Sequence, residues 1–302
     1  MKAQTKADLA MLLVTLFWGS SYLFMQMGLT DLATFNLIGI RFGIAFVLAA
    51  LFFHKRILRP SRKTVWHALI LGAILFGVFA TVTAGVKTTA ASQAGFLVSL
   101  TVIFVPLLSI LLKNRPENRV FFGAALAVVG IGMLTLTEHL QISRGDLLCI
   151  AAALCYATHI IVTGKLAPQS DAIQLGVYQL GFAALFGLLF SFAIETPRLP
   201  HSPKAWLAVL VLSILCSAIG FVVQTIAQQY TSPTHTGLIF SLEPVFAAVF
   251  AFLLTGETLS VRGYIGAALV LVSVLIAEID FKQWRRGKKQ NTATIAKQDL
   301  PL

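Results

Sequence analysis

Two ionisable side chains lie inside long apolar stretches of this chain, where a charge is unexpected. Arg41 interrupts the stretch 33–53, and Glu243 interrupts the stretch 234–255. A buried charge is costly unless it is paired, so each side chain should face a polar cavity or a partner. A guanidinium suits a carboxylate ligand, and a carboxyl group in apolar surroundings favours its neutral form and can exchange a proton or bind an amine. The competing interpretations are that Arg41 extends to an aqueous interface and that Glu243 only joins two helices.

Eight further side chains could take part in ligand binding, because they are polar or aromatic and lie in similar apolar stretches. They are Trp18 and Tyr22, one helical turn apart, then Gln93, Ser99, Thr101, Tyr156, His159 and Ser241. Together with Arg41 and Glu243 they are the predicted lining of a substrate-binding site. The alternative interpretations are packing for the aromatic rings and His159, and backbone hydrogen bonding for the hydroxyl groups.

Patterns typical of enzymes and metal sites are missing from the sequence. It contains no His-Glu-x-x-His zinc motif, and Thr163-Gly164-Lys165 lacks the preceding glycine of a phosphate-binding loop. Cys149, Cys155 and Cys216 all lie in apolar stretches and suit packing rather than a disulfide framework. We therefore predict no catalytic residue, no metal and no cofactor.

The composition is that of a membrane protein. Of 302 residues, 57% are hydrophobic and 12% are charged, whereas about a quarter of a typical soluble domain is charged. Residues 9–30, 64–86, 88–112 and 172–194 contain no Asp, Glu, Lys or Arg. Each is long enough to cross a hydrocarbon core and must do so as a helix, because lipid offers the backbone no hydrogen-bond partner. The net charge of +11 does not indicate a nucleic-acid partner, because the basic residues lie between and after these stretches.

Helix breakers and charges divide the chain into ten predicted spans of an all-α integral membrane protein. They lie near residues 8–28, 33–53, 66–85, 90–112, 119–137, 146–165, 172–193, 204–228, 234–255 and 260–279. Ten spans place both termini on one side, and most of the 23 Lys and Arg residues would then lie on that side. Basic residues concentrate in cytoplasmic loops. The prediction is a multi-pass protein of the inner (plasma) membrane with both termini in the cytoplasm.

The two halves of the chain resemble each other in order and spacing. Asp8-Leu9 and Phe17-Trp18 correspond to Asp146-Leu147 and Cys155-Tyr156, 138 residues later. Thr89, Gly95, Ser99, Leu100, Phe104, Leu111 and Leu112 recur 142 residues later as Thr231, Gly237, Ser241, Leu242, Phe246, Leu253 and Leu254. We predict a five-helix repeat over 1–140, a second over 141–281, and a basic cytoplasmic tail without fixed structure over 282–302. An odd number of helices inverts the second copy, as in secondary transporters whose site lies at the membrane midplane.

Several motifs resemble the EamA family of the drug/metabolite transporter (DMT) superfamily over almost the whole chain. They are Phe17-Trp18-Gly19-Ser20-Ser21, Arg41-Phe42, Ser241-Leu242-Glu243-Pro244-Val245, Leu253-Leu254-Thr255-Gly256-Glu257 and Gly266-Ala267-Ala268-Leu269. The resemblance implies a fold of two inverted five-helix repeats and transport of small metabolites, often export of amino acids or related compounds. Thr101-Val102 stands where the second repeat has Glu243-Pro244, so the expected site is asymmetric.

The sequence thus predicts a secondary transporter, not an enzyme, that works by alternating access at a central cavity. Its expected partners are a small-molecule substrate and the lipid bilayer, with proton coupling, the substrate's identity and the oligomeric state left open. One alternative is a membrane-embedded enzyme, which would need paired acidic residues or a zinc motif. The other is a channel-like facilitator, which would need a continuous polar pore.

Overall fold

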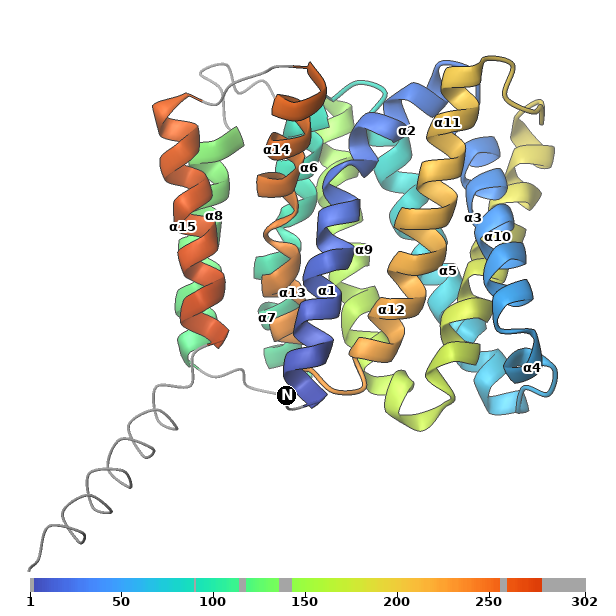
Figure 1. Ribbon diagram of the computed structural model, residues 1–302, viewed down its shortest axis with the longest axis horizontal. Helices are drawn as coiled ribbons and strands as arrows, with labels where there is room; N and C mark the ends of the chain where they lie inside the picture. Colours follow the sequence, from blue (N-terminus) through green and yellow to red (C-terminus); the bar gives the residue numbers. More distant parts are fainter. Residues whose placement is uncertain (1–2, 90, 114–117, 136–142, 256–259, 279–302) are drawn as a thin grey trace, which may run out of the picture.

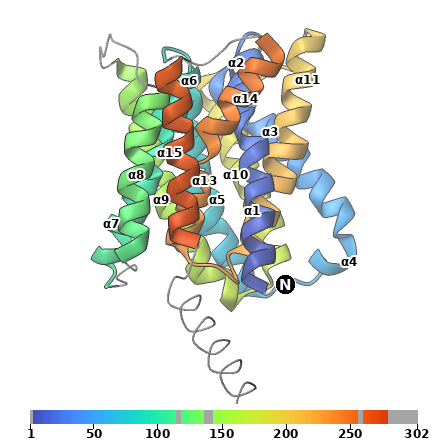
Figure 2. The ribbon, with the colours of Figure 1, turned by 60° about the vertical axis from the view of Figure 1, so that its left-hand side comes forward.

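The computed structural model describes residues 3–89, 91–113, 118–135, 143–255 and 260–278. Within these residues the protein is helical and contains no strand. The longer helices stand side by side with their axes roughly parallel, and they form one bundle (Figures 1 and 2). The first described residues and α4 lie at the same end of the bundle, which we call the N-terminal face.

The helices follow one another along the chain with short connections. In the first half they are α1 (Ala3–Gly19), α2 (Ser21–Leu29), α3 (Thr34–Phe52), α4 (His54–Ile57), α5 (Arg62–Gly85), α6 (Ala91–Ser99), α7 (Thr101–Leu111) and α8 (Asn118–Thr135). In the second half they are α9 (Arg144–Leu166), the 3-10 turn η1 (Ala167–Gln169), α10 (Ala172–Ile194), α11 (Pro203–Val211), the π-helix η2 (Leu212–Ile219), α12 (Gly220–Ala227), α13 (Pro233–Phe240), α14 (Glu243–Thr255) and α15 (Val261–Glu278).

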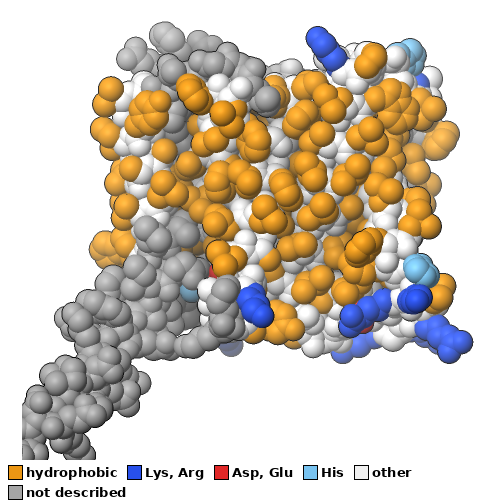
Figure 3. Space-filling model, in the orientation of Figure 1, with side chains coloured by type: hydrophobic (Ala, Val, Ile, Leu, Met, Phe, Trp, Pro, Cys, Tyr) orange, Lys and Arg blue, Asp and Glu red, His pale blue; other side chains and the backbone are white. Residues whose placement is uncertain are grey.

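The bundle has the surface and the helix lengths of a membrane protein, as predicted. Seven helical segments of the described chain are long and apolar enough to cross a membrane. They are Ala3–Leu29, Thr34–Phe52, Arg62–Gly85, Gln93–Leu111, Arg144–Gln169, Ala172–Ile194 and Pro203–Ala227. Hydrophobic side chains cover the visible flank of the bundle, and most of the visible Lys and Arg side chains lie along the N-terminal face (Figure 3). Each of the ten ranges predicted from the sequence contains a described helix.

Three of the predicted spans are interrupted part-way along. The breaks fall at Ser20, at Leu100 and at Ser241-Leu242. At each break a backbone N–H bonds to the carbonyl three residues earlier, as in Leu100 N to Leu97 O (3.2 Å). Pro244 stands in the first turn of α14, where its missing N–H leaves no helical bond unmade. The breaks therefore place helix ends inside the apolar bundle, including the N-terminus of α14 with Glu243.

Glycines let the paired helices approach closely. Helix α3 packs along α10, and α8 packs along α15. A Cβ atom added to Gly187 would lie 2.7 Å from the backbone nitrogen of Gly39, and one added to Gly130 would lie 2.7 Å from the carbonyl oxygen of Gly266. Without a hydrophobic force between helices in lipid, such close backbone packing is a main source of association.

Two acidic side chains join the connections at the face opposite the N-terminus. Glu195 accepts hydrogen bonds from the N–H groups of Phe35 (3.1 Å) and Asn36 (2.8 Å), and so caps the first turn of α3. Asp31 accepts from the N–H groups of Ser202 (2.7 Å) and His201 (2.9 Å). These backbone N–H donors favour the ionised form and lower the pKa of Asp31, which lies outside the helices. The α2–α3 connection is thereby fastened to the α10–α11 connection.

We expect Gly187→Ala to destabilise the protein, because its Cβ would overlap the backbone of Gly39. Overpacking of this kind costs about 1–3 kcal/mol. Gly43→Ala is the matched control on α3, since no atom lies within 4 Å of its added Cβ, and it should be neutral or stabilising. Thermal unfolding of the purified variants in one detergent measures both. Equal unfolding midpoints for the two variants would contradict the close packing of α3 on α10.

Candidate functional site

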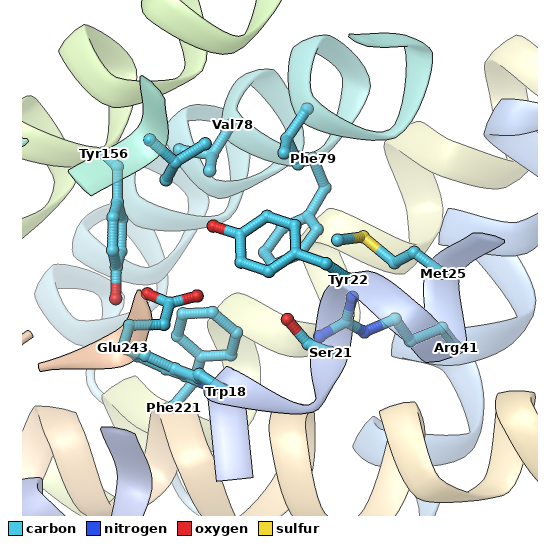
Figure 4. Close-up of a pocket in the computed structure, with 12 residues that line it drawn as sticks. Trp18, Ser21, Tyr22, Met25, Arg41, Val78, Phe79, Tyr156, Phe221 and Glu243 are labelled. Atoms are coloured by element: carbon cyan, nitrogen blue, oxygen red, sulfur yellow. The ribbon is translucent and has the colours of Figure 1, made fainter. Parts of the chain in front are cut away.

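A small cavity of about 40 Å³ lies inside the bundle, next to the helix breaks (Figure 4). Residues of eight α-helices line it, five of them in the first half of the chain and three in the second. Its lining consists of Trp18, Ser21, Tyr22, Met25, Arg41, Val78, Phe79, Val82, Val98, Tyr156, Phe221 and Glu243. Ligand pockets usually measure about 300–1,000 Å³, so the cavity is contracted in this conformation.

Arg41 is a buried cation without an anionic partner. Its side chain is 2% exposed, and no carboxylate in the described part of the chain forms an ion pair with it. Its Nε donates a hydrogen bond to Oγ of Ser217 (2.6 Å), and its guanidinium carbon lies 4.3 Å from the ring centre of Phe79. Its Nη2 has no hydrogen-bond partner among the described residues. The guanidinium therefore presents an unused donor at a cavity wall, where a carboxylate oxygen would satisfy it.

Glu243 lies on the other side of the cavity, at the start of α14. The hydroxyl of Tyr22 lies on the same side of the cavity as this carboxyl group (Figure 4). The hydroxyl of Tyr156 lies on the same side of the cavity, with Arg41 across from it (Figure 4), and has no hydrogen-bond partner among the described side chains and backbone. Glu243 and the two tyrosines thus form a cluster of acceptors and hydroxyls that could hold an ammonium group or exchange a proton.

Aromatic rings close the cavity toward the N-terminal face. The ring of Trp18 lies 4.8 Å from that of Phe240, 5.1 Å from that of Phe221 and 5.8 Å from that of Tyr156. The indole N–H of Trp18 donates to the carbonyl oxygen of Cys216 (2.7 Å) in the π-helix η2. Gly220 makes this possible, because a Cβ atom there would lie 2.7 Å from the indole nitrogen. The same π-helix also supplies Ser217 to Arg41.

A second cavity of about 10 Å³ adjoins Tyr156 and Glu243 on the side of α6, α7 and α13. Ser99, Thr101 and Ser241 line it, but each hydroxyl donates to a backbone carbonyl. Thr101, for example, bonds to the carbonyls of Val98 (2.7 Å) and Ala153 (3.2 Å). Their hydroxyls are engaged within the protein, as the alternative interpretation of the sequence held.

The structure brings together most of the predicted site residues. Trp18, Tyr22, Arg41, Tyr156 and Glu243 surround the larger cavity, while Ser99, Thr101 and Ser241 line the smaller one. Gln93 and His159 line neither of these two cavities.

Sequence reasoning missed the walls that α5 and α12 contribute. Phe79 and Phe221 both line the cavity, and their rings lie 5.8 Å apart. They are 142 residues apart, which is the repeat spacing found in the sequence, so the repeat was the signal that could have found them.

Broken helices that meet at a buried cavity with a few polar groups are the architecture of membrane transporters. The fold and the cavity therefore define this protein as a helical membrane transport protein.

The chain belongs to the EamA-like transporter family, whose model matches residues 5–136 and again residues 143–278. The predicted resemblance is confirmed. An uncharacterized transporter of Archaeoglobus fulgidus is 27% identical over 285 residues, which cover 90% of this chain and 97% of the relative. A protein of Salmonella typhimurium named as a probable amino-acid metabolite efflux pump is 24% identical over 292 residues, covering 92% and 96%. A solved crystal structure covers 91% of this chain with a TM-score of 0.77 and 19% identity, and so shares its fold.

We expect Arg41→Met to leave the thermal stability unchanged or to raise it. The substitution removes a buried cation with an unused donor, and a buried charge without a partner is destabilising. Phe42→Ala is the comparison at the neighbouring position, where the ring is fully buried and its loss should cost about 3–5 kcal/mol. Thermal unfolding in detergent measures both variants. A loss for Arg41→Met as large as that for Phe42→Ala would make Arg41 a structural residue.

Proposed function

We propose that this protein is a secondary transporter that exports an amino acid or a related small metabolite by alternating access at the central cavity. The observation that carries the proposal is the placement of Arg41 and Glu243 in one cavity without an ion pair between them in the described chain. The relative from Salmonella typhimurium, named as a probable amino-acid metabolite efflux pump, supports the same substrate class.

The proposed substrate carries a carboxylate and an amine. Its carboxylate oxygen would accept from Nη2 of Arg41, which lacks a partner among the described residues. Its amine would bind at the Glu243 carboxyl group beside Tyr22 and Tyr156. Between these poles the walls are Phe79, Val78, Val82 and other apolar side chains, which suits an apolar or aromatic substrate side chain.

The proposed architecture is a bundle of ten spans in two inverted five-helix repeats, at 1–140 and 141–281. Two inverted repeats are related by a two-fold axis. A helix that lies next to this axis packs against the equivalent helix of the other repeat. The contacts of α3 with α10 and of α8 with α15 are of this kind. The breaks at Leu100 and Leu242, 142 residues apart, and the double match to the family model support the same arrangement.

The proposed orientation places the N-terminal face in the cytoplasm of a cell with an inner (plasma) membrane, and the tail from residue 282 on the same side. The support is the concentration of visible Lys and Arg side chains along that face (Figure 3).

The cavity of about 40 Å³ must widen before such a substrate can enter. In a transporter of inverted repeats, rocking of one half against the other opens a central site to each side in turn. The aromatic contacts of Trp18 would have to separate in one of the two states, because they seal the cavity toward the N-terminal face.

Ligand stabilisation of the purified protein tests the proposal directly. A ligand that binds only the folded state at 100 times its dissociation constant stabilises it by about 2.7 kcal/mol. We expect leucine or phenylalanine to raise the unfolding temperature, and leucinamide and N-acetylleucine, which lack the carboxylate and the amine, to have less effect. Arg41→Met should abolish the difference between leucine and leucinamide. Equal stabilisation by all four compounds in both proteins would contradict recognition by Arg41 and Glu243. Saturable counterflow in proteoliposomes would then distinguish a carrier from a channel.

We expect Glu243→Gln to remain folded and to transport with a flattened dependence on pH. The amide keeps the size and hydrogen bonding of the side chain but cannot ionise. Tyr22→Phe is the matched control, since it removes a hydroxyl that lies beside Glu243 in the same cavity and leaves the carboxyl group. It should weaken transport while keeping the dependence on pH. A folded Glu243→Gln protein with the affinity, rate and pH profile of the native protein would show that Glu243 is only structural.

A further inference from the structure

A set of fully buried polar side chains lies between the cavity and the N-terminal face, outside the site described above. Its members are His159 and Thr163 of α9, Gln179 of α10, and Gln224, Thr225 and Gln228 at the end of α12, all at most 1% exposed. His159 Nε2 lies 3.0 Å from Oε1 of Gln179, and Nε2 of Gln179 donates to Oγ1 of Thr225 (2.8 Å). We call these six residues the inner polar cluster.

Several polar atoms of the inner polar cluster are left without a partner. Among the described residues, Nδ1 of His159, Oγ1 of Thr163 and Oε1 of Gln224 are buried and accept or donate no hydrogen bond. A buried polar group without a hydrogen-bond partner is destabilising, so apolar side chains would make a more stable core here. Polar groups inside membrane proteins typically face an aqueous path or a functional site.

The repeat spacing relates this cluster to the lining of the cavity. Ser21, Met25 and Arg41 line the cavity, and the residues 138 positions later are His159, Thr163 and Gln179. Val82 also lines it, and the residue 142 positions later is Gln224. Four members of the inner polar cluster are therefore the repeat counterparts of cavity residues.

The helix boundaries support this alignment. The residues that precede α3 and α10, Ala33 and Asp171, are 138 apart, as the first spacing requires. The ends of α5 and α12, Gly85 and Ala227, are 142 apart, as the second spacing requires.

We propose that the inner polar cluster lines a second half of the transport path, an aqueous vestibule that is closed here and opens to the N-terminal face when the cavity half closes. This inference rests on the proposed inverted repeats and alternating access. The cavity lining extends along α2 to Met25 and along α5 to Val82, both of which run toward the opposite face (Figure 1). The repeat counterparts of α2 and α5 are α9 and α12. If the two repeats exchange conformations, the opening beside α2 and α5 closes and an equivalent opening forms beside α9 and α12.

The contacts that close the vestibule are at the ends of α9, α12 and α13. A Cβ atom added to Gly164 would lie 2.8 Å from Cγ of Pro233, so α9 and α13 touch there. Nε2 of Gln228 donates to the carbonyl of Ile160 (2.9 Å). Separation of α9 from α12 and α13 would break these contacts and admit water to Nδ1 of His159 and the hydroxyl of Thr163.

The two halves of the path offer different chemistry to a solute. The cavity half has the guanidinium of Arg41 and the apolar side chains of Met25 and Val82. At the related positions the vestibule has the amide of Gln179, the hydroxyl of Thr163 and the amide of Gln224. Among the described residues that line the two halves, the permanent cation is Arg41 in the cavity half, and its counterpart in the vestibule is the uncharged Gln179.

Cysteine accessibility from each side of the membrane tests the vestibule without a known substrate. The background is the full chain with Cys149, Cys155 and Cys216 replaced by Ala, checked for monodispersity. Into it are introduced, singly, Met25→Cys and Val82→Cys in the cavity half, and Thr163→Cys and Gln224→Cys in the vestibule. A charged, membrane-impermeant methanethiosulfonate is added to right-side-out and to inside-out vesicles. Leu154→Cys, on the outer surface of α9 at 45% exposure, is the control and should stay unreactive in lipid.

We expect the cavity cysteines and the vestibule cysteines to react from opposite sides of the membrane, whichever side is the cytoplasm. The vestibule proposal would be overturned if Thr163→Cys and Gln224→Cys reacted from neither side. It would also be overturned if they reacted from the same side as Met25→Cys. A third outcome is that Thr163→Cys and Gln224→Cys react while Met25→Cys and Val82→Cys do not. This outcome would support the vestibule and contradict the proposed cavity site. The failures of the two proposals are thus distinguishable.

Discussion

The burial of Arg41 is the constraint on which the centre of this protein depends. A guanidinium with no carboxylate partner in the described chain is tolerated because other groups interact with it. Phe79 offers the face of its ring at 4.3 Å, which attracts a cation, and Ser217 accepts from Nε at 2.6 Å. These contacts hold the guanidinium between α5 and η2. They leave Nη2 unused, so the site is complete only when a ligand or water supplies an acceptor.

The helix breaks follow from the same need to satisfy polar groups away from water. A free helix end inside an apolar bundle must find partners within the protein. At the break before α14, the backbone N–H of Ser241 bonds to the carbonyl of Leu238 (3.0 Å) and that of Leu242 to Ile239 (3.1 Å). Pro244 needs no partner for its nitrogen. Glu243 then stands at the positive end of the α14 dipole, which favours a negative charge beside the cavity.

Sequence patterns predicted the elements of this fold better than their contacts. Charge-free stretches and breakers located the helices, because lipid leaves the backbone little choice. They could not predict the break at Ser20 or the π-helix over Leu212–Ile219, since both depend on tertiary partners such as Trp18. They also grouped His159 with the cavity residues, although it stacks on Tyr156 at 6.1 Å and bonds to Gln179. A sequence gives the depth of a side chain along a helix, but not the direction in which it points across the bundle.

The π-helix η2 accounts for much of the difference between the two halves. The residues that cap α5 and α11, Ser61 and Ser202, are 141 apart, yet the ends of α5 and α12 are 142 apart. The segment from α11 to α12 therefore contains one residue more than α5, and a π-helix absorbs an additional residue by bonding to the fifth residue along the chain. This change of register turns Ser217 toward Arg41 and the carbonyl of Cys216 toward Trp18. Helix α5 has no such segment, and Gln179, the counterpart of Arg41, bonds instead to His159 and Thr225. The hydroxyl that accepts from Arg41 thus lies in the segment where the two repeats differ by one residue.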